Sequence, residues 1–442
     1  MTSRELAYQV ANALVDAGHL AYLVGGCVRD ELLGLEPKDY DVATSALPEQ
    51  VLTLFPDARL VGAHFGVVLI RHNTAEVEVA TFRSDHSYVD GRHPAQVTFE
   101  REPRQDALRR DFTINALFRD PRSGCILDFV GGRSDLERRW IRAIGDARQR
   151  FEEDHLRMLR AVRLAARLGF DIEPQTFQAI AELREKITRV SPERIRDELV
   201  MILTEGAARR GFELLDQTGL LEVLLPEVAA MKGVPQPPEF HPEGDVWTHT
   251  LLMLEKLGRC STTLALGVLL HDVGKPPTFR VAERIRFDGH AERGAEMARQ
   301  ILTRLRFSND EIARVEALVA HHLRFKDVQQ MRESTLKRFL RMDHFDEHLE
   351  LHRLDCVASH GNLENYEFIR RKLAELPPEE IRPPRLVTGH DLIARGLQPG
   401  PRFREILQAV EDAQLEGKIC TRQQALELVD ELMRAEGGRQ VS

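Results

Sequence analysis

The position of strand-forming residues along the chain constrains the fold most strongly. Short β-rich runs, such as residues 21–24, 66–70 and 77–82, all lie before about residue 145. Beyond that point Leu, Ala, Arg and Glu recur at helical spacing, and strand patterns almost vanish. The sequence therefore predicts an α+β fold, in which a head with a mixed sheet is followed by an all-helical remainder.

Composition narrows the class of protein. With 442 residues the chain is long enough for two to four domains of roughly 100–200 residues each. Its net charge of −9 excludes a generally basic coat but not a local basic groove. Five scattered cysteines favour a reducing compartment. Because no apolar run approaches the roughly 18 residues of a membrane span, we expect a cytoplasmic protein without a membrane partner.

Two proline-rich segments, residues 234–239 and 376–384, interrupt the helical part. The block between them holds most of the histidines, which are common metal ligands. We therefore predict four domains: a head at 1–145, a helical neck and body at 146–234, a metal-binding domain at 235–375, and a helical tail at 376–442.

The segment LVGGCVRDELLGLEPKDYDVAT, residues 23–44, contains the first candidate site. A strand that ends in Gly25 and Gly26 before a helix lets a phosphate approach main-chain N–H groups, and Arg29 adds a cation. Asp39 and Asp41 are two residues apart, so on a strand they share a face and attract divalent cations. The alternative, a glycine turn followed by surface acids, is less consistent with all these features lying within one strand–helix–strand unit.

A third carboxylate is expected beside this pair. Glu76 and Glu78 alternate on the predicted strand AEVEVATFR, and Glu78 lies nearer its middle. We predict that Glu78 is the third carboxylate. The alternative is that Glu76 and Glu78 both lie on an edge strand and face solvent.

The motif LRRDFTINAL, residues 108–117, contains a second group of polar residues. Arg109 and Arg110 can neutralise phosphate. Asp111 and Asn115 share a face if the segment is helical, so they can bind a sugar or the main chain. The alternative is a helix with an ordinary charged start.

A row of arginines follows on the predicted helix within residues 145–170. Four like charges on one face repel one another unless an anion lies there. Asp154 paired with Arg157 could hydrogen-bond the edge of a nucleobase. A solvated basic face is the alternative. The residues of the row are Arg157, Arg160, Arg163 and Arg167.

In this order, the three motifs resemble the class II tRNA nucleotidyltransferases, which include CCA-adding enzymes, A-adding and CC-adding relatives, and bacterial poly(A) polymerases. The resemblance covers residues 20–205 and continues more weakly at 387–407. It implies a polymerase-β-like head and template-independent addition of CTP and ATP to the 3′ end of tRNA, with release of pyrophosphate. Residues 81–99 resemble the family's flexible loop, and this loop is complete.

The resemblance also implies roles for single residues. Asp39 and Asp41 would bind catalytic Mg²⁺, with Glu78 as the third catalytic carboxylate. Asp154 and Arg157 would serve as a protein template for the base of CTP or ATP. The nucleotide-binding residues would be Gly25, Gly26, Arg29, Arg110, Asp111, Asp154, Arg157, Arg160 and Arg163.

The histidine-rich block suggests a second metal site. His271 and Asp272 are adjacent, His249 lies upstream, and Lys275 follows within one turn, where it could meet a phosphate. Imidazole and carboxylate together suit a transition metal or Mg²⁺/Mn²⁺. For any single histidine the alternative is a structural role.

This block resembles the HD phosphohydrolase superfamily, which implies a divalent or transition metal of unknown identity. The ligands carried over are His249, His271, Asp272 and Asp355, and a larger two-metal set could include His290 and one of His321 or His322. In such nucleotidyltransferases the domain can act as a phosphodiesterase or phosphatase, or serve mainly as scaffold.

Several readings therefore stay open from the sequence. Full CCA addition, A addition alone and CC addition alone differ in loop detail, and the complete loop disfavours CC addition alone. A poly(A) polymerase is the nearest rival. Rivals of another class are an HD phosphohydrolase acting on nucleotides or RNA ends, and a non-catalytic RNA-binding protein. The oligomeric state is not determined by the sequence.

Overall fold

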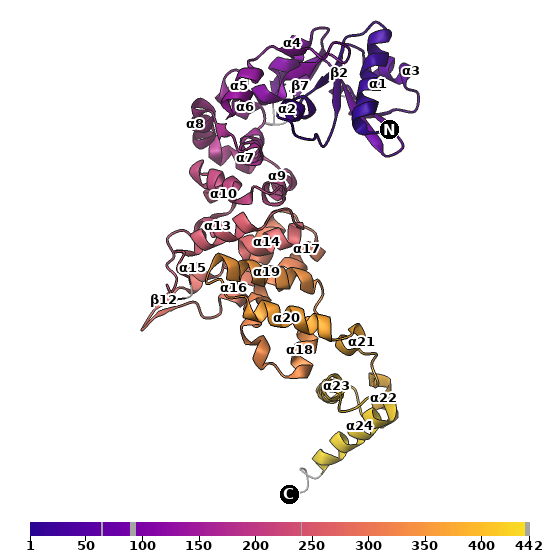
Figure 1. Cartoon of the computed structure of the whole chain (residues 1–442), viewed down its shortest axis with the longest axis vertical. Helices are drawn as coiled ribbons and strands as arrows, with labels where there is room; N and C mark the ends of the chain where they lie inside the picture. Colours follow the sequence, from indigo (N-terminus) through magenta and orange to yellow (C-terminus); the bar gives the residue numbers. More distant parts are fainter. Residues whose placement is uncertain (63–64, 89–93, 240, 438–442) are drawn as a thin grey trace. The chain divides into compact units, whose positions relative to one another are not determined.

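The computed structural model describes residues 1–62, 65–88, 94–239 and 241–437 (Figure 1). The chain divides into two compact units, which we describe separately. Unit 1 contains residues 1–232, 257–265 and 300–308, and unit 2 contains 233–256, 266–299 and 309–442. The finer division into four domains stays a prediction.

Unit 1 is built on a seven-stranded mixed sheet. The strand order is β3-β4-β5-β2-β1-β8-β9. β2 and β5 run parallel, whereas the other neighbours run antiparallel. This confirms the predicted α+β head. The strands are β1 (Ala21–Val24), β2 (Asp41–Thr44), β3 (Arg59–Gly62), β4 (Val67–His72), β5 (Ala75–Thr81), β8 (Leu117–Arg119) and β9 (Ile126–Asp128).

The helix α1 (Ser3–Asp16) packs against β1, β2 and β5 through one apolar face. Its start is fixed by a capping box between Thr2 and Glu5, which satisfies two main-chain N–H groups. Within the sheet core, Phe82 and Phe118 are fully buried and meet edge to face, with ring centroids 6.4 Å apart. The core therefore holds β1 and β2, which carry the candidate site, in a fixed register.

The remaining head elements surround the sheet ends. They are α2 (Gly26–Leu32), α3 (Pro48–Leu54), the hairpin β6 (Arg83–Tyr88) and β7 (Pro94–Phe99), α4 (Pro103–Leu108), the 3₁₀ turn η2 (Thr113–Asn115) and α5 (Gly132–Arg138). The hairpin corresponds to the predicted flexible loop, of which residues 89–93 lie outside the described residues.

Helices make up most of the rest of unit 1. The central one, α7 (Arg157–Leu168), buries eight residues of its apolar face and packs against α9 and α10. Around it lie α6 (Ala147–Glu153), α8 (Pro174–Leu183), α9 (Pro192–Thr204), α10 (Ala208–Gln217), α11 (Leu220–Leu224) and α12 (Pro226–Ala229).

Helices also dominate the chain from residue 233 onward. Beyond residue 146 the described residues form three strands of two residues each. They are β11 (Asp171–Ile172), which pairs with β10 (Trp140–Ile141), and the paired strands β12 (Arg280–Val281) and β13 (Ile285–Arg286). The helices used below are α13 (Val246–Lys256), α14 (Thr262–Leu270), α15 (Lys275–Thr278), α16 (His290–Arg304), α17 (Asn309–His321), η4 (His322–Gln330), α18 (Glu333–Leu340), α19 (Phe345–Ala358) and α20 (Glu364–Glu375).

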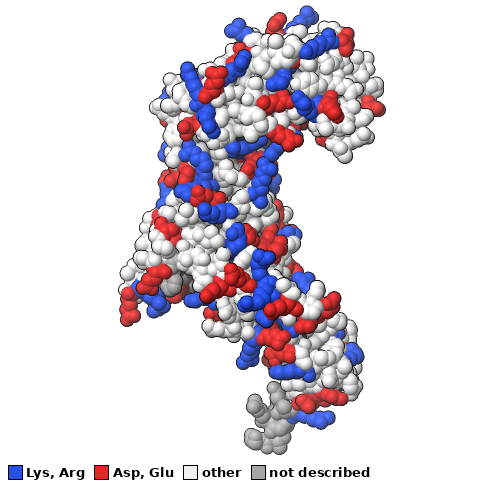
Figure 2. All heavy atoms as spheres, in the orientation of Figure 1, with Lys and Arg blue, Asp and Glu red and all other residues white. Residues whose placement is uncertain are grey.

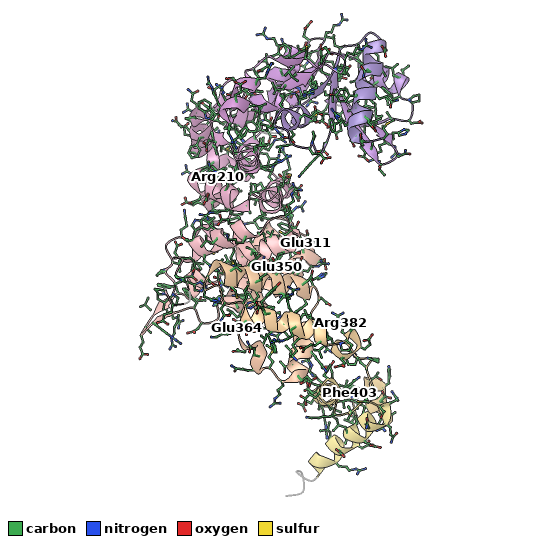
Figure 3. All side chains as sticks on the ribbon, viewed as in Figure 1. Arg210, Glu311, Glu350, Glu364, Arg382 and Phe403 are labelled. Atoms are coloured by element: carbon green, nitrogen blue, oxygen red, sulfur yellow. The ribbon has the colours of Figure 1, made fainter. Side chains whose placement is uncertain are left out.

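The end of unit 2 has an apolar core of its own. It is formed by α22 (Gly389–Ala394), α23 (Pro401–Leu415) and α24 (Arg422–Gly437), with Leu392 and Val429 fully buried. Phe403 of α23, labelled in Figure 3, packs against this core.

The surface has no uniform charge. On the face shown in Figure 2, Lys and Arg are interspersed with Asp and Glu. Among the described residues, no helix combines the length and the apolar character needed to cross a membrane.

Candidate active site

The turn after β1 lies next to the candidate metal-binding carboxylates. Gly25 adopts φ +83°, a left-handed conformation that favours glycine. A Cβ atom at Gly25 would lie 3.5 Å from Arg110 Nη1 and 3.7 Å from Asp41 Oδ2. The turn therefore brings together the main chain, a cation and a carboxylate that are far apart in the sequence. The strand β1 ends at Val24 and α2 begins at Gly26, so the predicted order of strand, glycine turn and helix is present, with the helix including Gly26.

Parallel pairing of β2 with β5 assembles the carboxylate group. Asp41 and Glu78 are register partners on the two strands, and Asp39 precedes β2 by two residues. Both glutamates of β5 are exposed, and Glu76 forms an ion pair with Arg71 at 2.7 Å. Burial is the main cause that raises the pKa of Asp41, and the charges of Glu78 and Asp39 add to it. Together they outweigh the opposite effect of Arg110 and bring the pKa to about 6. Carboxylates whose charges act on one another in this way attract a divalent cation, whose charge relieves their repulsion.

Arg29 is held inside the protein and is not a free cation. Only 3% of the residue is exposed. Its guanidinium forms an ion pair with Asp30 at 2.6 Å and donates to Asn115 Oδ1 at 2.6 Å. The expected cation at the start of α2 is therefore committed to protein partners, and its direct contact with phosphate stays a prediction.

Asp111 connects this network to α7. Asn115 donates to Asp111 Oδ1 at 3.1 Å, and Arg160 donates to Asp111 Oδ2 at 2.9 Å. Burial alone would raise the pKa of Asp111, but Arg160 and Asn115 outweigh it and hold the pKa well below its usual range. Asp111 and Asn115 thus share a face, as predicted, although the turn between them is 3₁₀ rather than α-helical.

Each arginine of the α7 row has a carboxylate partner from the protein itself. The sequence predicted that this row needs an anion, and the structure supplies four. The pairs are Arg157–Glu153 at 2.7 Å, Arg160–Asp111 at 2.7 Å, Arg163–Glu198 at 2.7 Å and Arg167–Asp30 at 3.0 Å.

The expected side-chain pair between Asp154 and Arg157 does not form in this structure. Asp154 pairs with Arg194 of α9 at 2.8 Å. Arg157 pairs with Glu153 and also donates to the carbonyl oxygen of Arg109 at 3.3 Å. The two residues are joined through the main chain, where the N–H of Arg157 donates to the carbonyl oxygen of Asp154 at 3.1 Å, but their side chains are held by different partners.

Two residues that position charged side chains of the candidate site were missed in the sequence. Asp106 is fully buried and forms ion pairs with Arg109 at 2.6 Å and Arg110 at 2.9 Å. Arg194 holds Asp154, as described above. The sequence did contain a signal for Asp106. It precedes Arg109 by three residues and Arg110 by four, the spacing at which side chains on a helix meet. Nothing local pointed to Arg194, which is 40 residues from its partner.

The HD residues gather in unit 2, from segments far apart in the sequence. His249 lies on α13, His271 and Asp272 follow α14, and Asp355 lies on α19, three helices labelled together in Figure 1. His249 Nε2 lies 3.2 Å from Asp355 Oδ1, and His271 Nε2 lies 3.1 Å from Asp272 Oδ2.

Two further histidines complete the cluster. Nε2 of His290, the first residue of α16, lies 3.6 Å from Asp272 Oδ1, and Nε2 of His322 lies 3.8 Å from the same atom. His322 is therefore the member of the predicted alternative pair that joins the cluster. His321 points elsewhere, with its ring centroid 6.2 Å from that of His348.

The imidazole rings are oriented as metal ligands. Nδ1 of His271, His290 and His322 hydrogen-bonds a main-chain carbonyl oxygen at 2.9, 2.7 and 2.7 Å. Because Nδ1 donates, the lone pair is on Nε2, which faces the cluster. The Nε2 atoms of His249, His271 and His290 are buried and make no hydrogen bond of acceptable geometry. Such unsatisfied nitrogen atoms beside carboxylates fit a metal ion.

Glu243 is a member of this centre that the sequence did not indicate. It accepts hydrogen bonds from His249 Nδ1 at 2.6 Å and from His241 Nδ1 at 2.9 Å. Burial alone would lower the pKa of His249, but the Asp355 and Glu243 carboxylates outweigh it and raise the pKa to about 9. A carboxylate on the outer nitrogen of a ligand histidine orients the ring toward a metal.

Lys275 differs from expectation. Its Nζ lies 2.6 Å from Asp272 Oδ2 and donates to Gln236 Oε1 at 2.6 Å. The side chain is buried, so it neutralises Asp272 and is not free to meet a phosphate.

The fold and site of unit 1 define a nucleotidyltransferase head with a helical extension, and comparison with known proteins is consistent with this class. The family model for the poly A polymerase head domain matches residues 21–142. The model for the probable RNA and SrmB-binding site of polymerase A matches 169–232, and that for tRNA nucleotidyltransferase domain 2 matches 290–429.

Similarity to CCA-adding enzymes extends over nearly the whole chain. The CCA-adding enzyme of Lactobacillus johnsonii is 32% identical over 421 residues, or 95% of each chain. That of Geobacillus stearothermophilus is 45% identical over 214 residues, 48% of this chain and 53% of the relative. The chain belongs to the class II tRNA nucleotidyltransferase family, of which these enzymes are members.

Solved structures agree with this assignment. The Bacillus stearothermophilus CCA-adding enzyme in complex with CTP has a TM-score of 0.76 at 28% identity, over 99% of this chain and 100% of that chain. A Thermotoga maritima CCA-adding enzyme complexed with tRNA is 20% identical, with a TM-score of 0.59 over 97% of this chain and 95% of that chain, and shares the fold.

The raised pKa of Asp41 leads to a test of the carboxylate group. Because the pKa of Asp41 is higher in the folded protein than in the unfolded chain, its ionisation lowers the stability of the fold. The loss begins as pH rises above the ordinary carboxyl pKa and is complete above the folded-state pKa of about 6. Without added metal at pH 7.5, Asp41→Asn should raise the melting temperature by about 2–4 °C, the shift that roughly 1 kcal/mol gives in a domain of this size.

The gain should shrink as pH falls from 7.5 to 4.5, measured by differential scanning calorimetry. Asp57→Asn, at an exposed position, is the control and should show no such trend. A gain that is independent of pH, or a loss of stability at pH 7.5, would contradict the crowding of Asp39, Asp41 and Glu78.

Proposed function

We propose that this chain adds nucleotides from CTP and ATP to the 3′ end of tRNA without a nucleic-acid template. The observation that carries this is the site where Gly25, Arg110, Asp41 and Glu78 meet. In the reaction the terminal 3′ hydroxyl attacks the α-phosphorus of the nucleotide. A new P–O bond forms, the bond to pyrophosphate breaks, and pyrophosphate leaves. A cytoplasmic location stays a prediction.

Asp39, Asp41 and Glu78 would hold Mg²⁺. When bound, Mg²⁺ lowers the pKa of an attacking hydroxyl and balances triphosphate charge. Because Gly25 has no side chain, the space beside its main chain, next to Arg110 and Asp41, is left free. A phosphate could approach the main-chain N–H groups of Gly25 and Gly26 there. Asp106 keeps Arg110 in place beside that turn, where its guanidinium can neutralise the developing charge.

Asp154 and Arg157 are suited to choose the base. A carboxylate accepts from an amino group, and a guanidinium donates to a ring nitrogen or carbonyl. Cytosine and adenine both present an amino group beside an unprotonated ring nitrogen, whereas uracil and guanine present a carbonyl beside a ring N–H. A fixed carboxylate with a neighbouring guanidinium therefore accepts C and A and rejects U and G. Arg194 and Glu153 provide that fixation.

The decisive experiment is incorporation of labelled CTP, and then ATP, into a tRNA transcript that lacks its 3′ CCA. We expect both to be added in the presence of Mg²⁺. Asp41→Ala should lower incorporation by at least about 10³-fold, because it removes a charge-stabilising group at the reacting phosphate. Its melting temperature should not fall, since the ionised carboxylate is disfavoured by the fold.

Other outcomes separate the alternatives. Addition of ATP alone to a CC-ended tRNA would indicate an A-adding enzyme, and ATP addition to many unrelated RNAs would indicate a poly(A) polymerase. Incorporation by Asp41→Ala at the wild-type rate would refute the metal assignment.

A second activity is favoured by the unsatisfied histidines of unit 2. We propose that they hold one or two transition-metal ions and that the centre hydrolyses phosphate esters. Among the described residues, three groups have ligand atoms that all lie within 4.8 Å of one another, and two of them contain the Nε2 atoms of the cluster and could each hold one ion. They are His249 with His271 and Asp355, and Asp272 with His290 and His322. A bound ion would supply a hydroxide at neutral pH. Water adds to phosphorus, the ester P–O bond breaks, and alcohol and phosphate result.

Metal content tests this centre independently of catalysis. His271→Ala should remove metal from the purified protein, as measured by inductively coupled plasma mass spectrometry. Glu243→Gln should keep the metal but weaken its binding about 10–100-fold, because the ring of His249 loses a charged orienting partner. Glu239→Gln, at an exposed position nearby, is the matched control and should bind as the parent does. Equal metal content in His271→Ala and the parent would contradict the site.

A further inference from the structure

A hollow in unit 2 lies where α18 meets the helices at the end of the chain. Its volume is about 700 Å³, within the roughly 300–1,000 Å³ of pockets that bind small organic molecules. Leu386 and Val387, just before α22, line one side, and Phe403 and Leu407 of α23 line another. The motif at residues 387–407, to which the proposed catalytic sites give no role, therefore builds much of its wall.

The inner side of this hollow is apolar. Val387 and Val410 belong to the buried core of α22, α23 and α24, and the partly buried side chains of Leu386, Phe403 and Leu407 pack against that core while also lining the hollow. Figure 3 labels Phe403. Because an apolar group placed against these side chains leaves water, the hollow favours a ligand with an apolar part.

Four arginines from three parts of the chain surround the apolar side. Arg338 lies on α18 and Arg341 directly follows that helix, Arg385 precedes α22, and Arg404 lies on α23. Four like charges around one hollow repel one another unless anions balance them. In a chain whose net charge is −9, this grouping is a local feature and not an average property of the surface.

The protein balances the charge of the two arginines contributed by α18 and its end. Glu411 of α23 accepts hydrogen bonds from Arg338 at 3.0 Å and from Arg341 at 2.7 Å, and Asp412 pairs with Arg338 as well. Burial alone would raise the pKa of Glu411, but the two guanidinium groups outweigh it and hold the pKa below its usual range. Two carboxylates therefore face these two arginines.

The other two arginines have no such partner. Within the part of the chain that the structure describes, Arg385 and Arg404 form no ion pair or hydrogen bond, and both are exposed. A guanidinium keeps its charge at neutral pH, and its paired donors match a carboxylate or phosphate. Two positive charges that line the hollow are therefore available to a ligand.

A small ligand fits these side chains better than an RNA backbone does. The side chains of Arg338 and Arg341 are only 24% and 30% exposed, and Phe403 is half-buried, so a ligand reaches them only by entering the hollow. An RNA duplex is contacted mostly through its phosphates and 2′-hydroxyls on the outside of the helix. It would meet the exposed arginines and leave the apolar side uncovered.

We propose that this hollow binds a small organic dianion, in which two negative charges are attached to a flat apolar group. Arg385 and Arg404 bind the charges, and Phe403 and Leu407 contact the apolar group. Bound there, the dianion joins the segment before α22 to α23 and stabilises the end of unit 2. This site is separate from the carboxylates of the head and from the histidine cluster, and its occupancy depends on neither proposed activity.

Binding of naphthalene-1,5-disulfonate, a flat dianion that resists hydrolysis, tests the site. With the full chain at low salt in isothermal titration calorimetry, we expect saturable binding to one site. The double variant Arg385→Gln, Arg404→Gln should weaken binding at least about tenfold, because two charge-assisted contacts are lost. The matched control is Arg332→Gln, Arg402→Gln, which removes the same charge at two exposed positions that do not line the hollow. Absence of binding, or equal weakening in both double variants, overturns the inference.

The chemistry of the ligand tests the apolar side. Naphthalene-1-sulfonate, which has one charge, should bind about tenfold more weakly than the disulfonate, since one charge-assisted contact is lost. Sulfate, which has two charges but no apolar part, should be weaker still. Sulfate that binds as tightly as the disulfonate would show that the hollow selects charge alone, and this overturns the inference.

Competition against the disulfonate distinguishes the two natural sources of such a dianion. Displacement by 1-naphthylphosphonate indicates a phosphate ligand, and displacement by naphthalene-2,6-dicarboxylate indicates a dicarboxylate. Either result supports the site, whereas failure of both compounds to compete overturns it.

Two further measurements separate a small ligand from RNA. A tRNA transcript should leave the disulfonate bound. Displacement by the transcript, or weaker transcript binding in Arg385→Gln, Arg404→Gln but not in the matched control, assigns the hollow to RNA and overturns the inference. In differential scanning calorimetry the disulfonate should raise the melting temperature of the parent and not of this double variant, because a ligand that binds the folded state stabilises it. An unchanged melting temperature of the parent at saturating disulfonate contradicts the stabilising role.

Discussion

A series of ion pairs and hydrogen bonds joins α2 to α7, and the arrangement of unit 1 depends on it. Its inner charged groups, Arg29, Asp30 and Asp111, lie out of water, so each needs a partner of opposite charge, and removal of one leaves another buried and unpaired. The helix α7, which begins at the candidate base-selecting residue Arg157, is thereby fixed to the glycine turn before α2. In order, the members are Arg167, Asp30, Arg29, Asn115, Asp111 and Arg160.

The two polar centres of the chain differ in how far the protein satisfies them. In unit 1 each arginine of α7 meets a carboxylate, so the site is stable before a nucleotide binds. In unit 2, Nε2 atoms of three buried histidines make no hydrogen bond. Leaving such atoms buried is unfavourable unless a cation occupies the cluster. Charged and polar side chains are therefore paired within the protein in unit 1. In unit 2 they form a ligand set suited to a cation.

The sequence placed the main elements of both sites. The glycine turn, the paired acids before and in β2, and the histidine–aspartate pair after α14 were all found from local patterns. It did not show that Asp154 would bind Arg194, that Lys275 would neutralise Asp272, or that Glu243 would orient His249. These contacts join residues from different elements, and a charged residue in sequence has many possible partners.

By itself the sequence determined which residues are available and in what local order, because turn geometry and the two-residue period of a strand act over a few neighbouring residues. It also determined the family, since those local patterns recur in a fixed order. The tertiary structure alone decided which charges neutralise one another. Coulomb attraction depends on distance and burial, and for Asp30 and Arg167, 137 residues apart, both are set by the packing of α2 and α7.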